Sequence, residues 1–357
     1  MKLRLAAALL LSATALTLTG CIDTSAPAAP MAATDIYLDY NVISGLYIQP
    51  EIADFAANGC CAPTILSDTP SSVGITAVAT DTSGNIYAAL FDFYAQEAEI
   101  DVFAGGSAAV NGSVAPTRTF HNGFMTAPVG GLTVDPSGNV YVYDYNQNLF
   151  KFTPVADGIA QPLFMLNGLI ADNGMTTDSK GNFYISATGA GPAPPCPGPG
   201  SCPTGINGDA IYVYSAGFDN LTPENIITPP DSEFIDGLAV DASGNIHASG
   251  ELTYGTYSGQ IETYAPTATG NATPTSTITG ANTLLSTGSY NTMTIDAVGT
   301  LYVRSLSYYG PGGTSTINEF PSTASGNVAP AVSINAGLPL YYPNVSIAVA
   351  SYAPTRR

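Results

Sequence analysis

The chain has 357 residues, of which 45% are hydrophobic and only 10% are charged, with 37 Gly, 27 Pro and no Trp. Its 8 Lys and Arg stand against 27 Asp and Glu, a formal net charge of −19, which argues against a nucleic-acid partner because such a surface repels phosphates. Lys and Arg, both good helix formers, are scarce while Gly, Pro, Thr, Val and Tyr abound, so a helical protein is also disfavoured.

The first 20 residues have the pattern of a secretory signal peptide. Lys2 and Arg4 supply the positive start, and Leu5 to Leu18 is an apolar stretch that is too short for a membrane span. The tetrapeptide Leu18-Thr19-Gly20-Cys21 resembles the bacterial lipobox, in which the Cys receives the lipid. We therefore expect an exported bacterial lipoprotein, held to a membrane through Cys21, in the outer membrane or facing the periplasm or cell surface. A plain signal peptide with a coincidental Cys is the alternative.

The rest of the chain is expected to form a tether and one large domain. Residues 21–34 contain the lipidated Cys and a Pro/Ala/Thr-rich stretch without apolar periodicity, which is typical of a flexible linker. The predicted organisation is a signal peptide over residues 1–20, a tether over 21–34 and a folded domain over 35–357.

Four further cysteines, Cys60, Cys61, Cys196 and Cys202, lie in the predicted domain. An even number in an exported chain is typical of disulfides. Cys196 and Cys202 lie in a Pro/Gly-rich loop that a local bridge could close, whereas the adjacent Cys60 and Cys61 could pair with each other or elsewhere. A structural zinc site is the competing interpretation, but neither of the two His lies near these positions.

One pattern recurs five times along the domain and predicts strand, tight turn, strand. Alternating apolar residues precede an Asp-x-x-Gly turn, and a β-branched or aromatic run follows it. We expect the Asp to accept hydrogen bonds from turn amides and the Gly to take the positive φ that closes the hairpin. The turn aspartates of the five copies are Asp81, Asp135, Asp178, Asp241 and Asp296.

A second module, typified by INEFPSTASGNVAPAVSI, adds two strands to each repeat. Four-stranded repeats at this spacing predict the blades of a β-propeller. Residues 345–350 match a first strand without a second, and residues 35–41 match a second strand without a first. Pairing them completes a composite blade and removes exposed sheet edges. The predicted fold is therefore all-β, a six-bladed β-propeller of four-stranded blades closed by its terminal strands.

The repeat unit, for example GLAVDASGNIH, resembles NHL repeats and the repeats of other six-bladed propellers, and the second module resembles repeats of uncharacterised exported bacterial propellers. This resemblance extends over about residues 35–350 and implies the fold. It implies no single function, because propellers host many unrelated activities.

Propeller sites usually lie at one mouth of the central channel, where the loop leading into each innermost strand points inward. In this repeat that position is five residues before the turn Asp. Carboxyl and amide oxygens converging there are ligands that Ca²⁺ takes, so Asn173, Asp236 and Asn291 are candidate metal ligands. The full ring is Thr76, Gly130, Asn173, Asp236, Asn291 and Val345, and the nearby binding candidates are Asp172, Glu233, Tyr290, Tyr342 and Asn344.

Two segments, Asp172-Asn173-Gly174-Met175 and Ile235-Asp236-Gly237-Leu238, resemble the regucalcin/gluconolactonase family. The resemblance implies that Asn173 binds a divalent metal and that Asp236 is a metal ligand and the general base for lactone hydrolysis. The chain departs from the family in its metal-binding Glu, which neither Thr76 nor Val345 supplies. In the competing interpretation, Asn and Asp before Gly simply make the tight turn that leads into a strand.

Other catalytic patterns are missing from the sequence: it has no GxSxG, no HExxH and no phosphate-binding Gly loop, and its two His form no cluster. The sequence therefore predicts an envelope-anchored binding or scaffold module that presents loops to a protein, a glycan or a small ligand. The alternative function is a metal-dependent lactonase-like hydrolase with Asp236 as base. A purely structural repeat protein is the third interpretation.

Overall fold

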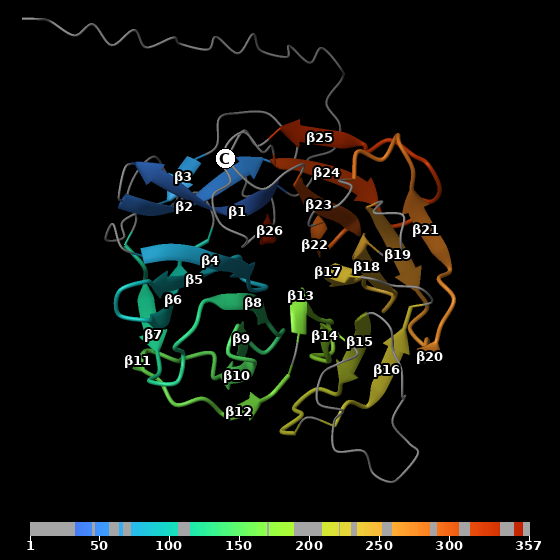
Figure 1. Ribbon diagram of the computed structural model, residues 1–357. Coiled ribbons are helices and arrows are strands. Elements are labelled where there is room, and N and C mark those ends of the chain that lie inside the picture. The colour runs from blue at the N-terminus through green and yellow to red at the C-terminus, as the bar shows by residue number, and fades with distance from the viewer. Residues whose placement is uncertain are drawn as a thin grey trace, which may run out of the picture. The chain divides into compact units, whose positions relative to one another are not determined.

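The computed structural model consists of β-strands and their connections in the part of the chain that it describes (Figure 1). No helix in that part is long and apolar enough to cross a membrane. The predicted signal peptide, Cys21 and the four candidate disulfide cysteines lie outside the described residues. The described ranges are 33–44, 47–56, 64–66, 73–105, 115–169, 171–188, 209–220, 222–229, 234–251, 259–285, 291–306, 315–335 and 346–352.

The strands form six sheets around a central axis, numbered here as blades 1 to 6, with the innermost strand of each named first (Figure 1). Blade 1 contains β26 (Ile347–Tyr352), β1 (Ala33–Ser44), β2 (Tyr47–Ala56) and β3 (Thr64–Leu66). Blade 2 contains β4 (Val73–Thr80), β5 (Ile86–Asp92), β6 (Glu97–Phe103) and β7 (Arg118–His121). Blade 3 contains β8 (Val129–Val134), β9 (Val140–Asp144), β10 (Asn148–Phe152) and β12 (Phe164–Asn167).

The second half of the ring repeats this antiparallel order. Blade 4 contains β13 (Ala171–Thr177), β14 (Phe183–Thr188), β15 (Asp209–Tyr214) and β16 (Asn225–Thr228). Blade 5 contains β17 (Phe234–Val240), β18 (Ile246–Glu251), β19 (Gln260–Tyr264) and β21 (Ser276–Thr279). Blade 6 contains β22 (Asn291–Ile295), β23 (Thr300–Leu306), β24 (Ser315–Pro321) and β25 (Val332–Asn335). The predicted six-bladed, four-stranded propeller is confirmed.

The turn aspartates organise the hairpin between the two inner strands of each complete blade. Asp135 shows the arrangement: Oδ1 accepts hydrogen bonds from the backbone amides of Ser137 and Asn139, each at 2.9 Å, and Oδ2 accepts one from the Asn139 side chain at 2.7 Å. Gly138 has a φ of +82°, as the turn requires. The Tyr141 hydroxyl also points at Oδ2, from 3.4 Å. The carboxylate thus satisfies turn donors that no strand partner could reach.

Hydrophobic clusters fill the spaces between neighbouring blades, so the core is divided into six wedges. The wedge between blades 3 and 4 is the most aromatic. Phe183 on β14 stacks on Tyr141 of β9 with 4.8 Å between ring centroids, and on Phe218 with 5.4 Å. Because each wedge needs both of its blades, no blade can bury its apolar surface alone.

Short parallel contacts also join the outer edges of neighbouring blades. β11 (Gly158–Ile159), in the outer connection of blade 3, pairs in parallel with β7 of blade 2. β20 (Gly270–Asn271) of blade 5 pairs in the same way with β16 of blade 4, and Gly326 of blade 6 bridges to Ile278 of blade 5. The second sequence module therefore does more than supply two strands, because its Gly segment binds the preceding blade.

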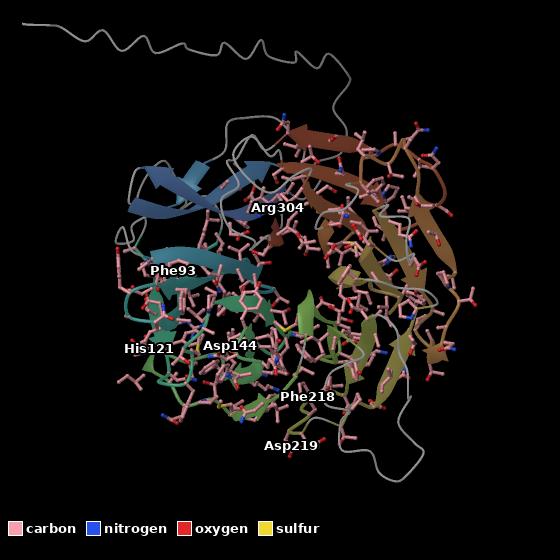
Figure 2. The ribbon with its side chains drawn as sticks, in the orientation of Figure 1. Phe93, His121, Asp144, Phe218, Asp219 and Arg304 are labelled. Carbon is pink, nitrogen blue, oxygen red and sulfur yellow. The ribbon has the colours of Figure 1, made fainter. Side chains whose placement is uncertain are left out.

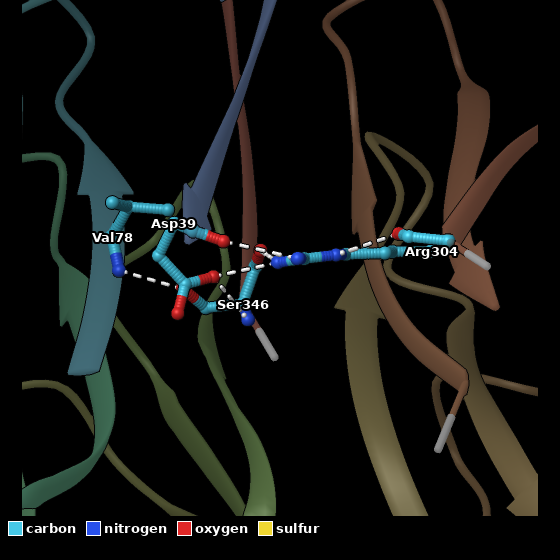
Figure 3. A network of polar contacts seen from close by, with 5 residues as sticks. Asp39, Val78, Arg304 and Ser346 are labelled. Atoms are coloured by element: carbon cyan, nitrogen blue, oxygen red, sulfur yellow. Dashed lines mark hydrogen bonds and ion pairs between the residues drawn. The ribbon is translucent and has the colours of Figure 1, made fainter. Parts of the chain in front are cut away.

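Strands from the two ends of the described chain close the ring, as the sequence predicts. β26 pairs antiparallel with β1, for example Tyr37 opposite Ala348, and together with β2 and β3 they complete blade 1. Arg304 on β23 of blade 6 is 1% exposed and reaches across to Asp39 on β1, which is fully buried. Its Nη1 donates to Asp39 Oδ1 at 2.6 Å, and Nη2 donates to the Asp39 backbone oxygen at 3.0 Å (Figure 3).

Ser346, directly before β26, extends this contact to a third blade. Its backbone amide donates to Asp39 Oδ1 at 2.8 Å, and its carbonyl oxygen accepts from Arg304 Nη1 at 2.9 Å. Its hydroxyl oxygen accepts the backbone amide of Val78 on β4, also at 2.8 Å (Figure 3). One connected polar network therefore joins blades 6, 1 and 2 at the closure.

Removing one charge of this pair should destabilise the ring more than removing both. Asp39→Asn or Arg304→Gln leaves an uncompensated buried charge, which costs about 3–5 kcal/mol. The double variant removes both charges, so urea denaturation should show a loss well below the sum of the two single losses.

Lys180→Gln, which removes an exposed charge on the turn of blade 4, is the matched control and should change the free energy of unfolding by less than about 0.5 kcal/mol. Strictly additive single and double losses would contradict the coupling.

Candidate functional site

β-Bulges coincide with three of the six predicted ring positions at one end of the channel. The register of β4 against β5 skips from Ile75 to Ala77, and that of β17 against β18 skips from Ile235 to Gly237. The skipped residues are Thr76 and Asp236, both members of the predicted ring, and Gly130 is skipped in the same way in β8. A bulge bends the strand and re-aims the extra side chain, so this repeat position lines the mouth.

Two of the three candidate metal ligands lie in neighbouring blades at this mouth. Asp236 on β17 is 7% exposed, and its Oδ2 accepts the backbone amide of Asn291 on β22 at 3.1 Å. The side-chain oxygen of Asn291 accepts the Ser305 hydroxyl at 2.7 Å. These contacts give both side chains roles in joining strands and blades. The structure describes the backbone of Asn173 and of Asp172 within β13, but not their side chains.

Four binding candidates of the mouth, Glu233, Tyr290, Tyr342 and Asn344, lie outside the described residues, as does the ring member Val345. Their predicted roles stay predictions. Among the residues with described placement, no group of three or more His, Cys, Asp or Glu could hold a metal ion. Of the three candidate metal ligands, the structure describes the side chains of Asp236 and Asn291, and Ca²⁺ binding at the mouth stays a prediction.

The glycines after Asn173 and Asp236 have a different role from the tight turn suggested by the sequence. Gly174 and Gly237 lie within β13 and β17, at irregularities of the strand register. A Cβ on Gly237 would lie 2.5 Å from both the Met293 amide nitrogen and the Ser249 hydroxyl oxygen. The interpretation as a strand-entering turn is therefore wrong, and the glycines are explained by the close approach of adjacent blades.

The channel holds two separate hollows in the described part of the chain. The mouth pocket has a volume of about 60 Å³ and is lined by Thr76, Gly130, Asp236, Thr292 and Ser346 among others. The larger hollow, about 500 Å³, lies at the opposite end of the channel, beside the turn aspartates, and we call it the turn-end chamber. Six apolar side chains line both hollows, one from each blade, and form the apolar ring: Val78, Leu132, Met175, Leu238, Met293 and Ile347.

One hydroxyl of the mouth pocket has no protein partner. Thr292 is 6% exposed, and its Oγ1 is buried without a hydrogen bond. A buried hydroxyl without a partner costs about 1–3 kcal/mol, and a pocket of 60 Å³ has room for ordered water. The mouth pocket thus fits water or a very small ligand.

Three exposed aromatic side chains lie on mouth-end loops of blades 2 and 3. Tyr94 in the β5–β6 turn is 86% exposed, Phe124 in the connection to β8 is 58% exposed, and Tyr145 in the β9–β10 turn is 46% exposed. We call these three residues the aromatic patch. Figure 2 labels Phe93 and Asp144, their neighbours in the chain, on adjacent blades.

Backbone hydrogen bonds join the loops that carry the aromatic patch. The amide of Ala98 donates to the Met125 carbonyl at 2.8 Å, and the amide of Tyr145 donates to the Pro128 carbonyl at 3.1 Å. A Cβ on Gly130 would lie 3.1 Å from the Tyr145 ring, so this aromatic ring lies directly against a mouth residue. The loops are therefore a fixed surface at the edge of the channel.

Two carboxyl groups of the propeller have strongly raised pKa values. Glu319 on β24 is 6% exposed, and burial together with the negative charge of Asp296 raises its pKa to about 7. On β2 of blade 1, burial and the nearby Asp35 raise the pKa of Asp54 to about 7 as well. No basic residue is among the causes of either pKa shift. The ionised form of each carboxyl therefore destabilises the folded state.

No protein-family model matches the chain, and no curated protein matches it. Solved structures of similar fold include the following two. A protein of unknown function from Bacteroides caccae has a TM-score of 0.51 and 9% identity, over 89% of this chain and 99% of that chain. The WD40 domain of Toxoplasma gondii coronin has a TM-score of 0.51 and 9% identity, over 90% of this chain and 80% of that chain. This likeness shows the fold alone, and with the sheet order it defines a β-propeller of six blades.

The closure pair and the chamber are the features that sequence reasoning missed. Arg304 lies eight positions after the turn Asp of its blade, where other blades carry Ser186, Ser249 and Tyr143. These three also donate to backbone oxygens of the next blade. The signal that could have revealed the pair was Arg304 itself. The other complete blades carry an uncharged residue at this strand position, and the chain has few basic residues.

The folded protein should become more stable as the pH falls from 8 to about 5.5. Glu319 titrates near 7 when folded and near 4.3 when unfolded, so in this window the folded state holds a proton that the unfolded state has lost. Glu319→Gln should therefore raise the free energy of unfolding by about 2–3 kcal/mol more at pH 8 than at pH 5.

Urea denaturation across this pH range measures the effect. Glu224→Gln, at an exposed carboxyl of blade 4, is the control and should leave the pH dependence as it is in the unmodified protein. An equal gain from Glu319→Gln at both pH values would show that the charge is not the cause.

Proposed function

We propose that this protein is a membrane-anchored binding module of the bacterial envelope, which uses the mouth-end loops of its propeller to hold a neutral glycan. The aromatic patch is the observation that carries the proposal. Rigid aromatic side chains give a large contact area at a low cost in conformational entropy. The lipobox-like segment at Cys21 supports the envelope address, and the NHL-like repeat supports a scaffold role.

The chemistry around the patch favours a sugar over a charged partner. Gln96, Asn146 and Gln147 are exposed beside the aromatic residues, and their amides can both donate to and accept from hydroxyl groups. The Asn146 amide nitrogen also donates to Thr126 at 3.1 Å, which orients that side chain. The net charge of −19 disfavours an acidic polymer as the partner.

Removing the aromatic rings should abolish this binding without disturbing the fold. Tyr94→Ala and Tyr145→Ala are each expected to weaken binding of neutral envelope glycans at least tenfold on a glycan array and by calorimetry. Tyr145→Phe keeps the ring and should retain most of the affinity. Val155→Ala is the control, since Val155 is 81% exposed and lies on the connection between β10 and β12.

Two results would count against the proposal. If both alanine variants still bind glycan with unchanged affinity, the glycan site does not lie at the aromatic patch. Specific capture of an envelope protein that depends on Tyr94 and Tyr145, with no glycan bound, would make the same surface a protein interface.

The alternative proposal is a lactonase-like hydrolase with Asp236 as general base. Its position at the mouth, where the Asp236 side chain is 7% exposed and lines the mouth pocket, is the support for it. Asp236→Asn can still accept the amide of Asn291, so the strand contact survives while the base is lost.

If the alternative holds, lactone hydrolysis should rise with pH as the carboxyl ionises and should fall at least a hundredfold in Asp236→Asn. Ca²⁺ titration by calorimetry tests metal binding in the same two proteins. Turnover that is unchanged by Asp236→Asn would eliminate this function.

A further inference from the structure

The turn-end chamber lies at the other end of the channel from the proposed glycan surface. Its volume of about 500 Å³ is within the range of small-molecule sites. Exposed turn residues, including Thr82, Ser179, Ala242 and Ala297, surround it, so it opens to solvent on that side. A ligand could therefore enter without any movement of the blades.

The chamber has an apolar floor. The apolar ring, with one side chain from each blade, lines the chamber on one side and the mouth pocket on the other. Five of its members are buried, and Met175 is partly exposed. Apolar surface at the bottom of an open hollow favours a ligand with an apolar end, because its burial releases water from both surfaces.

The walls carry hydroxyl groups that are not used to join the blades. Thr133, Thr176 and Thr294 occupy the position two residues before the turn Asp, and all three are partly exposed in the chamber. In contrast, the hydroxyls of Thr80 and Thr177 donate to carbonyl oxygens of the adjacent blade, at 2.7 and 3.1 Å. The three wall hydroxyls can thus accept hydrogen bonds from a donor group of a ligand.

The charged residues in the described lining of the chamber are all acidic. Four turn aspartates line it, and no Lys or Arg does so in the described part of the chain: Asp81, Asp178, Asp241 and Asp296. Their oxygens already accept the turn hydrogen bonds, so they act on a ligand through their field and not as direct ligands. A hollow lined by charges of one sign concentrates the opposite ion.

We propose that the turn-end chamber binds a small organic cation with an apolar tail, with the tail on the apolar ring and the ammonium group beside the threonine hydroxyls and the acidic rim. The chamber and the aromatic patch lie on opposite faces of the channel and share no residue. Failure of either proposal therefore leaves the other one standing.

Calorimetry with three probes of one shape tests the ligand class: n-hexylammonium, hexanoate and hexan-1-ol. The purified protein should bind hexylammonium, bind hexan-1-ol at least fivefold more weakly, and show no binding of hexanoate. Absence of hexylammonium binding, or equal binding of the ammonium and the carboxylate, would overturn the proposal.

Paired lysine variants locate the site. Ala242→Lys with Ala297→Lys adds two positive charges at exposed positions that line the chamber, whereas Ser243→Lys with Val298→Lys adds them at the adjacent exposed positions outside its lining. At about 0.15 M salt, where distant charges are screened, the first pair should weaken hexylammonium binding at least tenfold and the second less than threefold. The same loss in both pairs would mean that the cation binds the general surface, and would overturn the assignment.

Discussion

The buried pair of Asp39 and Arg304 stabilises the closed ring only when the two side chains have the correct geometry. Taking two charges out of water costs several kcal/mol for each, and the attraction between them compensates only when their geometry is right. That geometry exists only when blades 6 and 1 are in register and Ser346 connects them to blade 2. Ser346 also lines the mouth pocket, so the shape of the mouth depends on the same closure.

The two ends of the channel offer different chemistry because the repeat itself is asymmetric along each inner strand. At one end a β-bulge interrupts the inner strand of three blades, and the residue there varies from Thr76 to Gly130 to Asp236. At the other end the turn aspartates recur, since every hairpin needs them. The mouth, where the residue type varies between blades, is suited to specific recognition. The turn end, where an Asp recurs, presents negative charge.

The sequence was sufficient for the fold because each prediction rested on local chemistry. The Asp135 turn, its glycine at positive φ and the pairing of β1 with β26 follow from residues close in the chain or from missing strand partners. The contacts of the site were harder to predict from the sequence, since Asp236 and Asn291 contact residues on other strands and blades. Strand patterns also cannot show that Gly237 is needed for blade contact, or that a parallel segment such as β11 crosses to the preceding blade.

Closure through β26 and β1 has a consequence for the order of assembly. Asp39 and Ser346 are 307 positions apart, and bringing the ends of so long a loop together costs about 5 kcal/mol in chain entropy before any contact forms. The five blades built from neighbouring segments can form earlier, which leaves the joint between first and last strands as the slow step. Until then both strands present open edges. Two copies of the chain that meet in that interval could exchange β26 and form a domain-swapped dimer with the same strand pairing.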